Sequence, residues 1–154
     1  MTTSGVPFRK GHGTGNEFIL VSGLDGYFAD PKSVTPTIAQ NICNRDHGLG
    51  ADGILRVARA SEFEVDDAQY FMDYTNADGS LSATCGNGLR VFARYLVEAG
   101  LENRGQFTIG TRAGTVTVAI SETDTDFTNI AITMGHVSLG PMNVTVETET
   151  GSWP

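Results

Sequence analysis

Basic residues are scarce in this 154-residue sequence, which has 10 Lys and Arg against 18 Asp and Glu and a formal net charge of −8. Proteins that bind nucleic acid neutralise phosphates with clustered Lys and Arg, whereas the basic residues here are scattered along the chain. The same scarcity argues against an anionic membrane surface as a partner. The composition therefore predicts no nucleic-acid partner and no membrane partner.

Long apolar runs are also missing. No stretch approaches the roughly 20 consecutive apolar residues that a membrane-spanning helix needs. Residues 1–10 lack the apolar core of a secretory signal peptide. We therefore expect a cytoplasmic protein.

Cysteine is rare as well, with Cys43 and Cys85 as the whole complement. One disulfide could join them, but a domain of this size in a reducing compartment rarely depends on a single disulfide. The two residues also differ in setting, since Cys43 falls on the apolar face of an expected helix and Cys85 in a polar loop. We expect no disulfide and assign Cys43 to packing.

The chain does contain 40% apolar residues and 19 glycines, which fit a globular domain with many tight turns. Thr35 and Pro36 are a helix start, and residues 89–99 carry an apolar stripe at helical spacing. Short strands joined mostly by turns, with two helices, predict an α+β fold. The expected strands are residues 18–22, 54–59, 69–74, 107–111, 115–120, 129–134 and 144–148.

The most informative stretch ends in Cys85-Gly86-Asn87-Gly88 and leads directly into the second helix. The free N–H groups and the dipole of a helix N-terminus favour a thiolate there, which suits a thiol that takes up and returns a proton. The glycines allow close backbone approach to a ligand, and the N–H groups can hold a carboxylate. We identify Cys85 as the candidate catalytic residue.

Two alternative interpretations of Cys85 stay open. It could be a small buried residue, although core cysteines rarely have such polar neighbours. It could also be the nucleophile of a hydrolase, which would need a histidine base within reach. The chain offers His12, His47 and His136, none of which has a local signature.

Two further glycine-rich loops precede the Cys85 loop in the sequence. Residues 11–18 superficially resemble a dinucleotide-binding fingerprint, but that motif follows a strand and opens a helix, and here the order is reversed. This loop is either a ligand loop in which Asn16 offers an amide, or a turn into a strand. Residues 47–53 contain His47 and Asp52, too few ligands for a metal site, and are better explained as a helix end followed by a tight turn.

These loops, taken in order, resemble the diaminopimelate epimerase family across essentially the whole chain. The variant with Gly53 is similar to the actinobacterial branch. The motifs that carry the resemblance are residues 10–18 (KGHGTGNEF), 48–53 (GLGADG), 74–80 (YTNADGS), 85–90 (CGNGLR) and 110–114 (GTRAG).

The resemblance implies a single lobe of a two-lobed enzyme, with a β-barrel-like sheet wrapped around a central helix. The reaction it implies is epimerisation of LL-diaminopimelate to meso-diaminopimelate, a step that leads to lysine and peptidoglycan precursors. One thiol from each lobe transfers a proton, with no pyridoxal phosphate, no other cofactor and no metal. Cys85 matches the first-lobe cysteine, and the first-lobe substrate contacts match Asn16, Asn76, Gly86 and Asn87.

The sequence departs from the family pattern at Glu17, where Asp is usual, and at residues 83–84, where Glu-Met is usual. It also has no second cysteine in a glycine-rich turn. We therefore expect residues 1–141 to be the N-terminal lobe and residues 142–154 to be a linker or the start of a truncated second lobe.

Three expectations about assembly follow. The chain is part of an active epimerase, or it is a half that binds an amino acid without turnover. Because the two lobes of the family are related by an approximate two-fold axis, a homodimer could also place two copies of Cys85 across one cleft.

Overall fold

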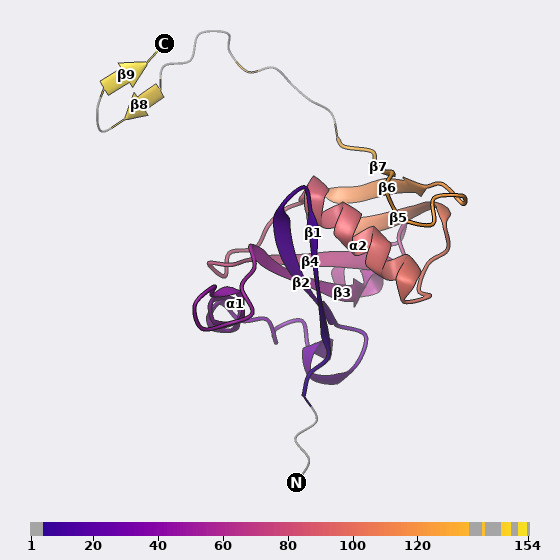
Figure 1. Cartoon of the computed structure of the whole chain (residues 1–154), viewed down its shortest axis with the longest axis horizontal. Coiled ribbons are helices and arrows are strands. Elements are labelled where there is room, and N and C mark those ends of the chain that lie inside the picture. Colours follow the sequence, from indigo (N-terminus) through magenta and orange to yellow (C-terminus); the bar gives the residue numbers. More distant parts are fainter. Residues whose placement is uncertain (1–4, 136–139, 141–145, 149–150, 154) are drawn as a thin grey trace.

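The structure is a computed structural model that describes residues 5–135, 140, 146–148 and 151–153 (Figure 1). One mixed sheet and two α-helices dominate it. Their bounds are β1 (Phe8–Gly13), β2 (Asn16–Ser22), α1 (Pro36–Cys43), β3 (Gly53–Arg59), β4 (Tyr70–Asn76), α2 (Gly86–Glu98), β5 (Gly105–Thr111), β6 (Gly114–Ile120) and β7 (Ile130–Ile132), with 3-10 helices η1 (Gly26–Ala29) and η2 (Ala60–Phe63). Strands β8 (Val146–Thr148) and β9 (Gly151–Trp153) form a second, antiparallel pair.

The seven strands of the main sheet lie side by side in sequence order, from β1 to β7. The pairs β2–β3 and β4–β5 are parallel, and the other neighbours are antiparallel. Parallel neighbours require a crossover connection, and the two crossovers contain α1 and α2 respectively (Figure 1).

Helix α2 is the centre of the fold, and the sheet curls around it. Its buried residues Leu89, Phe92, Ala93 and Leu96 have no exposed surface and share one core with side chains from β2 to β6. An apolar stripe on a helix is stable only where another element covers it, and here the curled sheet does so. The expected α+β lobe, with a sheet wrapped around a central helix, is confirmed.

Helix α1 packs in a second core on the other face of β2 and β3. Thr35 accepts the Ile38 N–H at 3.2 Å and Pro36 occupies the first helical turn, as the sequence predicts. Cys43 is 3% exposed and lies in this second core with Ala39 and side chains of β2 and β3. The expected packing role of Cys43 therefore agrees with its position.

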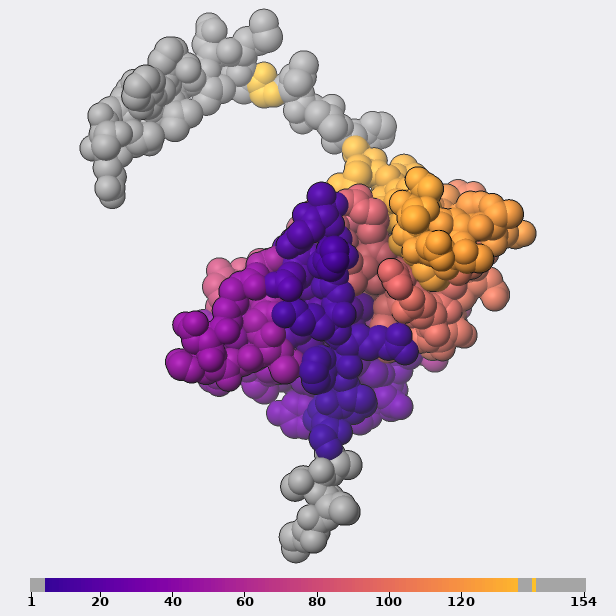
Figure 2. Space-filling model, in the orientation of Figure 1, coloured from indigo at the N-terminus to yellow at the C-terminus, as the bar shows by residue number. Residues whose placement is uncertain are grey.

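Strand β1 was not expected from the sequence, which indicated only a glycine-rich loop. It is the edge strand of the sheet, mostly exposed, and Figure 2 shows it in indigo on the surface. A Cβ atom at Gly13 would lie 2.7 Å from the Asn87 carbonyl oxygen, and one at Gly11 would lie 3.1 Å from Val91 Cγ1. These glycines are needed because β1 packs directly on α2, which the sequence pattern alone does not reveal.

The start of α2 also differs from expectation. Helix α2 begins at Gly86, three residues before the expected start at Leu89, because Cys85 supplies the N-cap. The last expected strand is described only at Val146–Thr148. The proposed division after residue 141, and much of the segment 142–154, lie outside the described residues. Within the described chain, no helix has both the length and the apolarity to cross a membrane.

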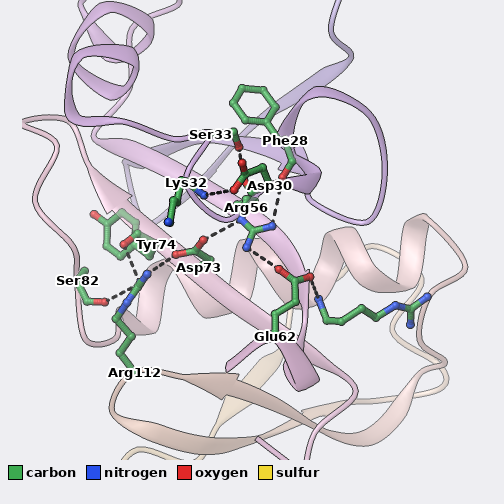
Figure 3. A network of polar contacts seen from close by, with 11 residues as sticks. Phe28, Asp30, Lys32, Ser33, Arg56, Glu62, Asp73, Tyr74, Ser82 and Arg112 are labelled. Carbon is green, nitrogen blue, oxygen red and sulfur yellow. Dashed lines mark hydrogen bonds and ion pairs between the residues drawn. The ribbon is translucent and has the colours of Figure 1, made fainter. Parts of the chain in front are cut away.

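A buried arginine organises the face of the sheet that points away from α2 (Figure 3). Arg56 has no exposed surface, and its Nε donates to Asp73 Oδ2 at 2.8 Å. Its other nitrogens donate to Glu62 Oε2 at 2.9 Å and to the Phe28 carbonyl at 3.2 Å. Arg56 therefore joins β3 to β4, η1 and η2, and the carboxylates of Asp73 and Glu62 compensate its buried charge.

The same network reaches the loop before Cys85. Arg112, in the β5–β6 turn, donates to the second carboxylate oxygen of Asp73 and to the carbonyls of Tyr74 and Ser82 (Figure 3). The Ala113 N–H donates to the Ala83 carbonyl at 3.1 Å. The β5–β6 turn thus holds the segment that leads into α2.

Replacing Asp73 tests how much the fold depends on this network. Asp73→Ala leaves the Arg56 guanidinium buried without its main counter-charge, so the free energy of unfolding should fall by about 3–5 kcal/mol. Urea denaturation followed by circular dichroism measures this. Glu98→Ala, which removes the exposed ion pairs to Arg9 and Arg94, should cost no more than about 1 kcal/mol. Equal losses in the two variants would contradict the prediction.

Candidate active site

Cys85 is the N-cap residue of α2. Its backbone is extended (φ −153°, ψ 114°), its carbonyl accepts the Leu89 N–H at 2.8 Å, and its Sγ atom accepts the Gly88 N–H at 3.4 Å. The thiol is half-buried at the end of the helix where N–H groups lack helical partners. The predicted placement of Cys85 directly before a helix is confirmed.

Asn16 lies beside this thiol although it is 69 residues away in sequence, and the distance from its Oδ1 to Cys85 Sγ is 3.8 Å. A two-residue hairpin turn between β1 and β2, with positive φ at Thr14 (55°) and Gly15 (80°), places Asn16 at the first position of β2. The packing of β1 on α2 then carries this hairpin to the start of the helix.

The register of the sheet gathers the other loops at the same edge. Phe18 pairs with Gly53 and Gly53 pairs with Asn76, so the starts of β2 and β3 and the end of β4 coincide. The Asp52 N–H donates to the Glu17 carbonyl at 2.8 Å, and the Ala77 N–H donates to the Asp52 carbonyl at 3.0 Å. Three loops that are distant in sequence therefore form one hydrogen-bonded rim.

The remaining predicted substrate contacts occupy this rim and the first turn of α2. Asn76 ends β4, and its Nδ2 donates to Ser80 Oγ at 3.0 Å. Asn87 accepts a hydrogen bond from Arg90 through its Oδ1 atom. Gly86 and Asn87 are the first two residues of α2, next to Cys85. The described contacts join Asn16 directly to Cys85 but do not include one between Asn76 and Cys85.

The sequence interpretation overlooked an ionic cluster behind Asn16. Asp52, assigned to a simple turn, accepts the Asn16 Nδ2–H at 2.7 Å and the Glu17 N–H at 2.8 Å through one oxygen, Oδ2. Its other oxygen accepts from Arg45 at 2.9 Å, and Arg45 also bridges to Glu17 at 2.5 Å. Lys10 lies 3.4 Å from Glu17. An Asp directly before a strand carries no local signal of such a cluster.

Both carboxylates of this cluster are held in the charged form. The Glu17 N–H, followed by the Asn16 amide, keeps the pKa of Asp52 below its usual range. Hydrogen bonds from Arg45, followed by Lys10, lower the pKa of Glu17. Asp52 is therefore an acceptor over the ordinary pH range.

Tyr74 packs in the main core next to the site. It is 6% exposed, stacks edge-on against Phe18 and shares the main core with Cys85. Burial, followed by the charge of a Cys85 thiolate, raises the pKa of Tyr74 to about 12, so its hydroxyl stays neutral. A Cβ atom at Gly53 would lie 2.5 Å from Tyr74 Cε2, which explains the glycine at this position.

The histidines do not support a hydrolase site. His12 and His47 are exposed, and the described hydrogen bonds of Cys85 involve neither of them. His136 lies outside the described residues. Among the residues that are described, no three His, Cys, Asp or Glu side chains are grouped as a metal site.

Comparison with known proteins gives a family match and several relatives. The family model described as diaminopimelate epimerase matches residues 8–140. The diaminopimelate epimerase of Corynebacterium glutamicum is 44% identical over 133 residues, which are 84% of this chain and 47% of that enzyme. The Rhodococcus erythropolis enzyme is 40% identical over 154 residues, covering 92% of this chain and 51% of the enzyme. The chain thus spans about half the length of the curated relatives it matches.

Solved structures of lower identity share the fold. A probable proline racemase from Agrobacterium radiobacter superposes with a TM-score of 0.68 at 16% identity, covering 96% of this chain and 47% of the other. A hydroxyproline epimerase from Agrobacterium vitis gives 0.66 at 16% identity, covering 94% and 46%. These likenesses establish the lobe architecture.

The two free thiols should differ sharply in reactivity. Burial raises the pKa of Cys43 to about 11, so at pH 8 this thiol is both protonated and inaccessible, whereas Cys85 is half-buried at a helix N-terminus. Iodoacetamide should therefore label Cys85 at least tenfold faster than Cys43, as measured by peptide mass spectrometry. In urea the two rates should converge. Faster labelling of Cys43 in the folded chain would show that Cys85 is the wrong assignment for the site.

Proposed function

The chain belongs to the diaminopimelate epimerase family, and from this we propose that it is the lobe that carries one of the two reacting thiols of a diaminopimelate epimerase. The observation that carries the proposal is Cys85 at the N-cap of α2 with Asn16 beside it, within a segment that the family model matches. The reaction inverts one α-carbon, converting LL-diaminopimelate to meso-diaminopimelate.

In the proposed step, the Cys85 thiolate removes the α-proton or, in the reverse direction, the thiol delivers it. The C–H bond breaks, its electron pair stays on carbon, and the proton moves to sulfur. A thiol on the opposite face then gives a proton to that carbon, so atoms and charge balance without a co-reactant. The Gly88 N–H, 3.4 Å from Sγ, supports the thiolate before transfer.

The first turn of α2 supplies donors for the substrate carboxylate. The leading N–H groups of a helix have no intrahelical partners, and the turn begins at Gly86 and Asn87. Donors placed there stabilise the negative charge that develops when the α-carbon loses its proton. Asn16 and Asn76 add neutral amides at the rim, which suits a substrate that carries two ammonium and two carboxylate groups.

The second thiol has to come from outside this chain's active-site rim. The sequence contains two cysteines, and Cys43 is buried in the core behind β2 and β3. We propose that residues 1–141 form the first lobe and that a second lobe supplies the other thiol. A second copy of this chain is the alternative source of the other thiol. Sedimentation at micromolar concentration distinguishes the two sources, because a monomer excludes the second copy.

Exchange of the α-proton tests the assignment of Cys85. In a protein that carries both reacting thiols, Cys85→Ala should lower the rate of LL to meso conversion at least 1,000-fold, because one face loses its proton carrier. Cys43→Ala should retain most of the rate and lose stability instead. Incorporation of deuterium at the α-carbon in D2O, followed by NMR, measures the reaction in both variants. Loss of exchange in a folded Cys43→Ala variant would refute the assignment.

Protection of the thiol tests substrate binding separately from turnover. Diaminopimelate should slow alkylation of Cys85, since the bound substrate covers the thiol, and Asn76→Ala should weaken that protection by about tenfold in concentration. A chain that shows protection but no α-proton exchange is an amino-acid-binding module. Absence of protection up to tens of millimolar would contradict diaminopimelate as the ligand.

A further inference from the structure

Among the predicted site residues, the described hydrogen bonds of the Asp52 side chain reach Asn16 alone. Its Oδ2 accepts the Asn16 Nδ2–H at 2.7 Å, and the opposite end of the same amide, Oδ1, lies 3.8 Å from Cys85 Sγ. The amide of Asn16 therefore lies between a carboxylate and the thiol. Its two ends differ chemically, since the nitrogen only donates hydrogen bonds and the oxygen only accepts them.

This arrangement fixes which end of the amide meets the thiol. An ionised carboxylate only accepts hydrogen bonds, so the Asn16 nitrogen must face Asp52 and the carbonyl oxygen must face Cys85. The opposite orientation would set two acceptors against each other at 2.7 Å. The choice follows from Asp52 being a carboxylate.

Asp52 is itself held in place from three sides. The Glu17 N–H donates to the same oxygen at 2.8 Å, and Arg45 donates to the other oxygen at 2.9 Å. The Asp52 backbone N–H also donates to the Glu17 carbonyl at 2.8 Å. The Asp52 side chain can therefore neither rotate away nor take up a proton easily. Its hydrogen bond to Asn16 in turn holds the Asn16 amide in place.

We propose that Asp52 is a positioning residue that keeps the Asn16 carbonyl against the Cys85 thiol, and this rests on the proposed role of Cys85. The sulfur then has one donor, the Gly88 N–H at 3.4 Å, and one acceptor, the Asn16 carbonyl. The donor favours the thiolate and the acceptor favours the thiol. A sulfur that must both take and return a proton benefits from having one partner of each kind.

The test is the pH dependence of Cys85 alkylation, measured without substrate. In Asp52→Ala, the Asn16 amide is free to rotate and present its N–H to the thiolate, so the midpoint of the alkylation profile should move about one pH unit lower. Below the midpoint this appears as a roughly tenfold faster rate at a fixed pH. Asp52→Asn should shift in the same direction, because Arg45 attracts the new carbonyl and leaves the new amino group facing Asn16.

Two further variants separate positioning from simple charge loss. Glu17→Gln removes one negative charge from the same cluster but leaves the Asp52 carboxylate, so the midpoint should move far less than in Asp52→Ala. In an Asn16→Ala background, Asp52→Ala should cause no further shift, because Asp52 acts through Asn16. The other titratable groups on the neighbouring elements, the neutral Tyr74 hydroxyl on β4 and the Arg90 guanidinium on α2, which donates to Asn87, are the same in every variant.

Alkylation profiles of Asp52→Ala and Asp52→Asn that coincide with the wild-type profile would overturn the inference. An equal shift of the midpoint when Asp52→Ala is made in the Asn16→Ala background would overturn it as well. Resistance of Cys43 to alkylation in each variant shows that the core is intact, so unfolding is recognised directly. Because turnover is never measured, failure of the proposed epimerase activity is detected by the α-proton exchange and not by this experiment.

Discussion

The packing of α2 inside the curled sheet is the interaction on which the rest of the structure depends. Its stripe of Leu89, Phe92, Ala93 and Leu96 has no exposed surface, so burying it fixes the position and rotation of the helix within the sheet. Once the rotation is fixed, the first turn can point in only one direction. The N-cap Cys85 is therefore placed by apolar contacts deep in the core and not by its own polar neighbours.

The sheet converts this fixed helix into a site by its register. A shift of one residue between β2 and β3 would move the interior side chains to the opposite face, so burial of Phe18 and Leu55 on the α2 side leaves a single alignment. That alignment brings Asn16, Asp52 and Asn76 to one edge. The ionic network of Arg56 and Asp73 on the other face then ties β3 to β4 and, through Arg112, to the segment before Cys85.

The sequence predicted the features that have local causes. Helix α1 begins at Thr35-Pro36 because capping is a short-range interaction, and the alternation of β6 and the stripe of α2 follow from burial of one face. Strand β1 escaped prediction because its glycines look like a loop in the sequence. Gly11 and Gly13 are in fact required by the contact of β1 with α2, which is a tertiary cause. The contact of Asp52 with Asn16 escaped prediction for the same reason, since Asn16 lies 36 residues away and meets Asp52 only where β2 pairs with β3.

A proton-transferring thiol has requirements that a nucleophilic thiol does not share. A nucleophile gains from every donor that stabilises the thiolate, whereas a group that returns its proton loses as much in one direction as it gains in the other. The surroundings of Cys85 fit the second requirement, because the helix N-terminus gives a donor at Gly88 and the amide of Asn16 gives an acceptor. The donor comes with the N-cap position, while in our proposal the acceptor depends on Asp52, which orients the amide. We therefore infer that a carboxylate that does not touch the sulfur contributes to its chemistry.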